Sequence, residues 1–155
     1  MKRWLYYLGT VAAVAALSAE PSAGSDIGKL QPVQAVCITV SDGQVTVRTD
    51  TEDRGTGETL AAAVSNMQET ATGEVFLETA DHLLLAPDCQ FLLRDVMALL
   101  RPSCSLCWME GEPEMEDVGL FLQIHAPETT LKDYRAGKCT VQTLRTQNGR
   151  MQLVS

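Results

Sequence analysis

Two of the five cysteines, Cys104 and Cys107, form a Cys-x-x-Cys motif, a spacing that can serve a redox disulfide or a zinc site. Either chemistry requires both sulfurs to point to one place. Residues 103–110 have the composition of a β-strand, and residues three apart on a strand point to opposite faces. Because no second Cys-x-x-Cys is present either, we predict neither a metal site nor a redox site.

The neighbours of the cysteines are mostly apolar, as in Val36-Cys37-Ile38. An odd number of cysteines cannot pair completely within one chain. We therefore favour small buried side chains with free thiols over a disulfide framework. This prediction covers Cys37, Cys89, Cys104, Cys107 and Cys139.

The sequence contains only two histidines, His82 and His125. Either could act as a general base, but nothing nearby in the sequence suggests a nucleophile, a base and a group that orients the base. We predict that both lie in the core or at its boundary. A hydrolase would need such a base within hydrogen-bond reach of a serine, threonine or cysteine.

Two further groups of residues resemble ligand sites but lack the required spacing. Gly55-Thr56-Gly57 has no Lys-Ser/Thr after it, so it does not match a phosphate-binding loop, and we predict a flexible connector at 51–57. An acidic cluster lacks the spacing of a calcium loop and is expected in a solvated loop and helix N-terminus. Its members are Glu110, Glu112, Glu114, Glu116 and Asp117. We thus predict no catalytic, metal-binding or cofactor-binding residues.

The elements around these residues follow from hydrophobic periodicity. An Asp-Gly pair at 42–43 between β-branched segments 33–41 and 44–50 predicts a hairpin, and Asn148-Gly149 predicts another between 138–146 and 150–155. Further strands are expected at 74–79 and 103–110, and 80–86 is an apolar stretch. Helices are expected at 59–71, 87–101, 115–126 and 130–134. Together these elements predict an α/β (α+β) single domain with a mixed β-sheet flanked by helices.

The helix predicted at 87–101 has one apolar face and several charged residues off it. Its inner face is predicted to consist of Phe91, Leu92, Val96, Leu99 and Leu100. Arg94, Asp95 and Arg101 lie off that face. Arg101 is followed by Pro102, which ends the helix.

Residues 1–25 have the layout of a signal peptide or membrane anchor, and residues 26–155 form the domain. Met1-Lys2-Arg3 is positive, the uncharged run Trp4–Ala19 spans 16 residues, and small polar residues follow. A spanning helix needs about 20 residues, so both cleavage after about Ser18 and retention as a short anchor remain open. No cysteine lies between Leu17 and Asp26 to carry a lipid. The protein is expected outside the cytoplasm, secreted or membrane-associated.

The charge of the chain limits its partners. The formal net charge is −8, and two of the 12 basic residues lie in the N-terminal segment. A surface this acidic repels nucleic acid and anionic lipid headgroups. We exclude both as partners of the domain.

Residues 26–111 resemble the N-terminal domain of the spore germination Ger(x)C family, the C subunits of germinant receptors. The resemblance is carried by Phe91-Leu92-Leu93-Arg94-Asp95, the Arg101-Pro102-Ser103 that follows, and the surrounding order of helix, strand and helix. The chain departs from the family at Asp81-His82, where Gly-His is usual, and at Val96-Met97, where Pro-Glu is usual. It also lacks the lipid-bearing cysteine and is shorter, as in a divergent relative.

The resemblance implies a non-enzymatic component of a germinant receptor. Such subunits lie on the outer face of the inner spore membrane beside integral membrane subunits, which would be the partners. Arg94 and Asp95 match the family pattern, and with Arg101 they are the candidate partner interface; the alternative is that they are ordinary solvated surface residues. The alternative function is an unrelated exported module that binds a small ligand or peptide in an apolar pocket.

Overall fold

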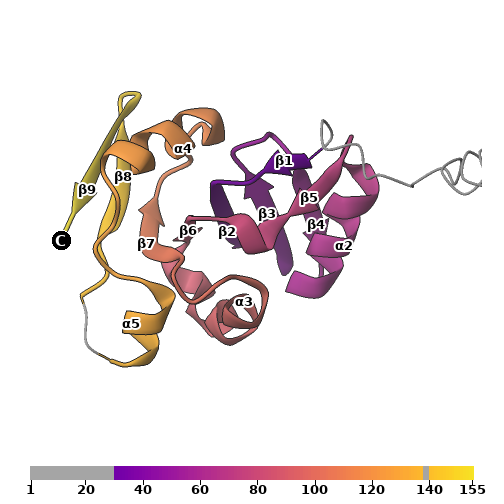
Figure 1. Cartoon of the computed structure of the whole chain (residues 1–155), viewed down its shortest axis with the longest axis horizontal. Helices are drawn as coiled ribbons and strands as arrows, with labels where there is room; N and C mark the ends of the chain where they lie inside the picture. Colours follow the sequence, from indigo (N-terminus) through magenta and orange to yellow (C-terminus); the bar gives the residue numbers. More distant parts are fainter. Residues whose placement is uncertain (1–29, 138–139) are drawn as a thin grey trace, which may run out of the picture.

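A seven-stranded mixed sheet with helices on both faces forms the body of the protein in the computed structural model, which describes residues 30–137 and 140–155 (Figure 1). The strand order is β4-β3-β2-β6-β7-β8-β9. These strands are β2 (Ala35–Ser41), β3 (Gln44–Thr49), β4 (Arg54–Gly57), β6 (His82–Leu85), β7 (Ser105–Glu110), β8 (Thr143–Gln147) and β9 (Arg150–Val154). The predicted α/β architecture is confirmed. The predicted N-terminal signal or anchor at 1–25 lies outside the described residues.

The sheet is parallel at its centre and antiparallel at both sides. β2, β6, β7 and β8 run parallel to one another, whereas β3, β4 and β9 are antiparallel to their neighbours. The outer pairs are closed by the two predicted hairpin turns. Asp42, Gly43, Asn148 and Gly149 all have positive φ, between 51° and 77°, as two-residue hairpin turns require. Both hairpin predictions are therefore confirmed.

The predicted flexible connector at 51–57 is wrong, because Arg54–Gly57 forms the edge strand β4. The glycines of this strand allow the helix α2 (Leu60–Thr70) to lie directly on it. A Cβ added at Gly55 would overlap the carbonyl oxygen of Ala63 and lie 2.5 Å from the Cβ of Met67. Gly-Thr-Gly here is a packing contact between strand and helix, a role that local sequence does not distinguish from a loop.

The helix predicted at 59–71 is present and begins with a side-chain cap. The Thr59 hydroxyl accepts a hydrogen bond from the backbone N–H of Ala62 at 3.2 Å, which satisfies one of the free donors of the first turn. The inner face of α2 consists of Leu60, Ala63 and Met67, all buried. The predicted strand at 74–79 is shorter, because only β5 (Glu74–Phe76) is extended. It pairs in parallel with β1 (Leu30–Pro32) in a separate two-stranded sheet, and η2 (Leu77–Thr79) is a 3₁₀ turn.

The helix predicted at 87–101 consists of a 3₁₀ segment, η3 (Pro87–Leu92), followed by the α-helix α3 (Leu93–Leu99). This change of winding corrects the predicted inner face. Phe91 is 68% exposed, and Leu93 is buried in its place with Leu92, Val96 and Leu100. The reason is that a 3₁₀ segment has three residues per turn and an α-helix 3.6, so one periodic stripe cannot continue through both.

Two helices follow β7. α4 (Met115–Ile124) lies within the helix predicted at 115–126 and buries Val118 and Leu122. α5 (Leu131–Arg135) begins with a capping box between Thr130 and Asp133. His125 caps the end of α4 and is exposed, with its ring centroid 4.8 Å from that of Phe121. His125 therefore lies outside the core, because the helix ends one residue before it.

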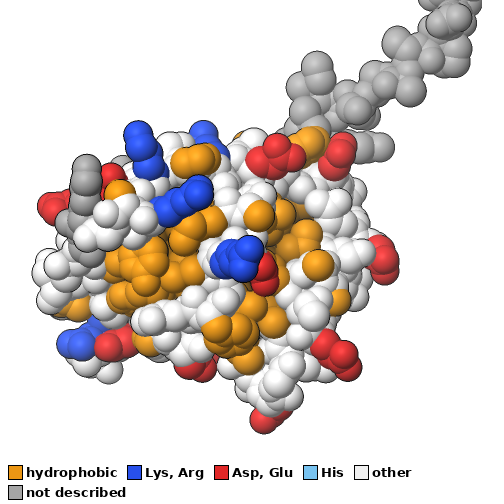
Figure 2. Space-filling model, turned by 90° about the horizontal axis from the view of Figure 1, so that it is seen from below, with side chains coloured by type: hydrophobic (Ala, Val, Ile, Leu, Met, Phe, Trp, Pro, Cys, Tyr) orange, Lys and Arg blue, Asp and Glu red, His pale blue; other side chains and the backbone are white. Residues whose placement is uncertain are grey.

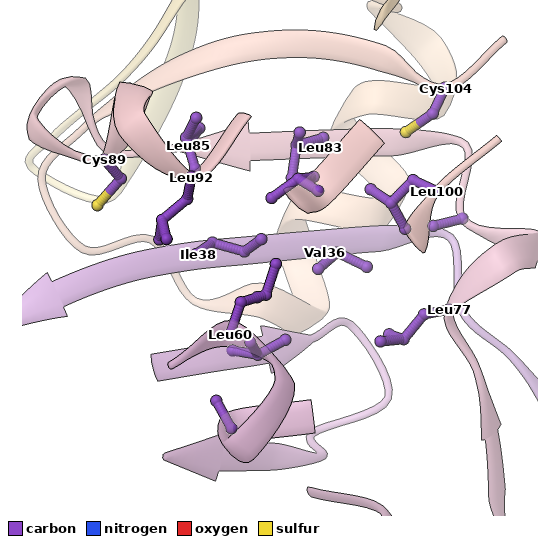
Figure 3. Packing of buried hydrophobic residues seen from close by; sticks show 14 of the residues in the cluster. Val36, Ile38, Leu60, Leu77, Leu83, Leu85, Cys89, Leu92, Leu100 and Cys104 are labelled. Carbon is purple, nitrogen blue, oxygen red and sulfur yellow. The ribbon is translucent and has the colours of Figure 1, made fainter. Parts of the chain in front are cut away.

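The sheet separates two hydrophobic clusters. Val36 and Ile38 of β2 face the larger cluster, which α2, η3, α3 and α5 cover, while Cys37 of the same strand faces a smaller cluster under α4. Figure 3 shows Leu60 and Leu92 pointing toward the Ile38 strand in the larger cluster. This burial of apolar side chains on both faces accounts for the near-continuous apolar sequence of the central strands.

Candidate functional site

The exposed side of η3 and α3 forms a ridge, which we call the α3 ridge and define as Phe91, Arg94, Asp95 and Ala98. All four residues are exposed. Figure 2 shows the face of the molecule on which α3 and α5 lie: apolar side chains reach the surface in several places, and near the centre a basic and an acidic side chain lie side by side. Of the segment that carries the family resemblance, Phe91, Arg94 and Asp95 are thus exposed, whereas Leu92 and Leu93 are buried.

An open groove lies between the α3 ridge and α2, with a volume of about 530 Å³. We call it the α2–α3 groove. Its apolar side chains are those of Leu60, which is buried, and of Val64 and Leu99, which are half-buried. The full lining is Thr59, Leu60, Ala61, Val64, Ser65, Gln68, Asp95, Ala98 and Leu99.

The small residues of the two helices account for this groove. Ala61 and Ser65 on α2 face Ala98 on α3 across it, and such short side chains cannot fill the space between two helices. Larger side chains at these positions would close the gap.

Few polar groups in the groove are available to a ligand. The Gln68 side chain donates to the carbonyl oxygen of Val75 at 3.1 Å, and the Thr59 hydroxyl caps α2. Asp95 is the charged residue of the lining, and no ion pair of Asp95 is present in the described parts of the chain. An apolar floor with one unpaired carboxylate at its side is suited to an apolar group that carries a positive charge.

The opposite side of the α3 ridge is basic. Arg94 lines a second, smaller hollow of about 360 Å³ with Met97, Ala98 and Arg135 of α5. Next to it, Met97, Leu131, Lys132 and Arg135 line a third hollow of about 80 Å³ together with Pro102. Arg94 and Asp95, which were predicted to belong to one partner interface, thus face two different hollows with opposite charge preferences.

Arg101 is separate from these two residues. Its guanidinium forms an ion pair with Asp81 and donates from Nε to the carbonyl oxygen of Ala80 at 3.1 Å. Both partners belong to the segment that enters β6. Arg101 lines none of the three hollows, so the structure gives it a role in holding the start of β6 to the end of α3.

His82 and Ser105 form a contact that sequence reasoning missed. The Nδ1 atom of His82 lies 2.7 Å from the hydroxyl oxygen of Ser105, so the base-to-hydroxyl contact that a hydrolase requires is present. The two residues are paired across β6 and β7 although they are 23 positions apart. No local pattern reveals this, because the register of two parallel strands is set by the whole sheet.

The surroundings of this pair favour a structural role. His82 and Ser105 are only 7% and 6% exposed, and neither lines the hollows around α3. Desolvation by burial lowers the pKa of His82, an effect that the carboxylate of Asp81 opposes. A neutral imidazole bonded to a buried hydroxyl satisfies both polar groups, as burial requires.

The described cysteines are buried free thiols, as predicted. Cys104 belongs to the larger cluster and Cys107 to the smaller one on the other side of the sheet, which confirms that the two sulfurs of the motif point apart. Burial raises the pKa of Cys37, Cys104 and Cys107 to about 12 and that of Cys89 to about 11. Such thiols stay protonated at neutral pH and are poor nucleophiles. Cys139 lies outside the described residues.

The predicted acidic loop lines a cleft with the β3–β4 turn. Glu112, Glu114, Glu116 and Asp117 lie there with Arg48 and Arg54 among them. Within residues 30–137 and 140–155, no group of three or more His, Cys, Asp or Glu side chains is placed to hold a metal ion.

A comparison of the chain with protein-family models, with curated proteins and with solved structures finds no match. In the same described part of the chain, no helix combines the length and the apolar character that crossing a bilayer requires.

Proposed function

We propose that this protein is a non-catalytic binding module that recognises an amphipathic helix of another protein through the α3 ridge and the α2–α3 groove. The observation that supports this most is Phe91, a large aromatic side chain that is 68% exposed beside Arg94 and Asp95. Aromatic residues and arginine dominate the binding energy of protein interfaces. A groove between two helices is a common receptor for the apolar face of a third.

The charges on the two sides of the ridge specify the helix further. Asp95 lies in the α2–α3 groove, so the bound helix carries a lysine or arginine at the edge of its apolar face. Arg94 and Arg135 lie on the other side of the ridge, where a carboxylate of the partner is favoured. The two contacts fix the direction of the helix, because reversing it would place like charges together.

A charge exchange tests this recognition. The probes are three synthetic amphipathic helices with one apolar face, which differ only in a Lys, Gln or Glu at the boundary of that face. We expect the Lys peptide to bind the protein about two- to fivefold more tightly than the Glu peptide, as for exposed ion pairs, measured by fluorescence anisotropy. Asp95→Lys should reverse the order. If no peptide binds, or if the order is unchanged in Asp95→Lys, the proposal is wrong.

A matched pair of α2 variants tests the groove itself. Ser65→Trp places a large side chain into the lining, whereas Glu69→Trp changes an exposed residue of the same helix outside it. Ser65→Trp should abolish peptide binding, and Glu69→Trp should leave it unchanged. Equal effects of the two substitutions would remove the groove from the proposal.

The cellular setting is a second part of the proposal, supported by the resemblance alone. In this setting the protein is held outside the cytoplasm by its N-terminal segment, and the bound helix belongs to an integral membrane subunit of a germinant receptor. A photo-crosslinking residue at Phe91 should then capture that subunit in sporulating cells, whereas one at Glu69 should not. Constitutive expression, with no multi-pass membrane protein encoded beside the gene, would exclude this setting.

The size of the groove also favours a second candidate, a small apolar ligand. A volume of about 530 Å³ falls in the range of ligand pockets. An apolar fluorescent probe such as N-phenyl-1-naphthylamine should then bind to the protein, and the Ser65→Trp variant should not bind it. Failure of the protein to enhance the fluorescence of the probe would exclude this candidate.

A further inference from the structure

The two edges of the seven-stranded sheet differ in how they are protected. At one edge, β4 is short and α2 lies against its glycines. In addition, the side-chain oxygen of Asn66 accepts a hydrogen bond from the backbone N–H of Thr56 at 3.1 Å. At the other edge, β9 pairs with β8 alone among the described strands. Arg150 at its first position is the charged residue of β9, and the strand contains no proline that would block pairing.

The hairpin turn determines which backbone groups of β9 are unpaired. The two-residue turn makes Gln147 and Arg150 a hydrogen-bonded pair, so Gln152 also bonds to β8. Met151 and Leu153 lie between these pairs and direct their N–H and C=O groups away from the sheet. Their side chains are half-buried against the cluster under α4. The open edge thus combines free backbone groups with an apolar side.

We propose that β9 pairs with β9 of a second copy of this chain, antiparallel and centred on Gln152, to form a continuous sheet through a two-fold axis. In this register Met151 lies opposite Leu153 of the partner in both halves. These are the two residues whose backbone groups point outward, so every such group in this part of the edge finds a partner. A shift to either side would leave one of the two residues in each copy without its match.

The side chains of β9 are compatible with the same register. Met151 and Leu153 of one copy meet those of the other on the sheet face covered by α4. There they join the smaller hydrophobic cluster of one copy to that of the other. Arg150 lies opposite Val154, and the two Arg150 residues are offset by four positions, or about 13 Å along the strand. Like charges therefore do not face each other across the pair. This self-complementarity is why we assign a second copy rather than another protein to this edge.

The affinity of the proposed dimer should depend on the salt concentration. Each chain carries a formal net charge of −8, so two copies repel each other, and screening shortens the range of that repulsion to about 8 Å at physiological ionic strength. Dimerisation should therefore become stronger between 20 and 300 mM salt. An interface held by ion pairs would become weaker over the same range.

A cysteine crosslink tests the register in the full chain, purified in mild detergent. Gln152 and its partner copy would form a non-hydrogen-bonded pair with a Cα separation of about 4.5 Å, which suits a disulfide. In a Cys139→Ser background, Gln152→Cys should give a covalent dimer on mild oxidation. Gln147→Cys, an exposed site on β8, should not. Equal crosslinking at both positions, or none at either, would overturn the proposal.

A substitution of the free edge completes the test. Met151→Pro removes an outward N–H while leaving the bonds to β8 intact, a position at which an edge strand tolerates proline. It should weaken the dimer at least tenfold in sedimentation equilibrium while retaining the unfolding transition. Leu153→Lys, which places a charge on the same edge, should have the same effect. Dimerisation that survives both changes would show that β9 is not the interface.

Discussion

Gly55 offers the sharpest test of the packing that positions the α2–α3 groove. Replacing it with alanine adds one methyl group at the contact between β4 and α2. That methyl would overlap the carbonyl oxygen of Ala63 and lie 2.6 Å from the backbone nitrogen of Met67. Because these are backbone atoms of a helix, no side-chain rotation can relieve the overlap, and α2 must move.

The magnitude follows from the cost of overpacking. Inserting a methyl group into a tightly packed site typically costs about 1–3 kcal/mol, occasionally more. The rigid neighbours place Gly55→Ala at the upper end, so we expect a loss of about 3 kcal/mol or more. A domain of this size has a total stability of about 5–15 kcal/mol, so the variant should be visibly destabilised yet still measurable.

Gly43→Ala is the matched control. Gly43 has a φ of +77° but nothing within 4 Å of an added Cβ, so alanine there meets only the cost of a left-handed backbone, about 1–2 kcal/mol. Urea unfolding, followed by circular dichroism with the slope of the transition held as a check, compares the two. A smaller loss for Gly55→Ala than for Gly43→Ala would refute the close packing of α2 on β4.

Three further predictions concern burial and titration. Phe91→Ala should change the free energy of unfolding by no more than about 0.5 kcal/mol, because the Phe91 side chain is exposed. Leu93→Ala should lower it by about 2–5 kcal/mol, because Leu93 is buried. Equal losses of the two variants in urea unfolding would contradict the corrected helix face. The lowered pKa of His82 means that the unfolded chain binds the proton more readily, so stability should fall as the pH drops below about 6.5, and His82→Gln should reduce this dependence in thermal melts. The raised pKa values of the buried thiols mean that the stability they contribute is retained below about pH 9 and declines as the pH rises toward 12. In a Cys139→Ser background, these thiols should react with Ellman's reagent only when the protein unfolds. Rapid reaction of the folded protein would contradict their burial.

The cysteine motif shows what can be predicted about side-chain orientation once a segment is assigned as a strand. Alternation along 103–110 was sufficient to predict that Cys104 and Cys107 point to opposite faces, and the two hydrophobic clusters confirm it. Cys37 and Cys107 share a face, yet β6 lies between their strands. Strands two apart are separated by about 9.6 Å, which is beyond the Cα separation of a disulfide. Cys89 and Cys104 lie at opposite ends of the larger cluster (Figure 3).

The ridge and the groove could not be predicted in the same way. Their residues were individually visible in the sequence, and Arg94 and Asp95 were singled out. Their division between two hollows depends on the spacing of α2, α3 and α5 on the sheet. The exposure of Phe91 depends on the change from 3₁₀ to α-helical winding at Leu93, which no periodicity in the sequence marks.

The sequence alone determined the features that are set within a few residues. Asp42-Gly43 and Asn148-Gly149 specified both hairpins because few other residues accept positive φ in such turns. Thr130 specified the start of α5 through its side-chain cap, and alternation specified the two faces of β7. Tertiary structure decided what depends on distant partners. The parallel register of β6 and β7 brought His82 to Ser105, and the contact with α2 made Gly55 part of a strand. Such placements follow from the packing of whole elements, which local backbone preferences do not encode.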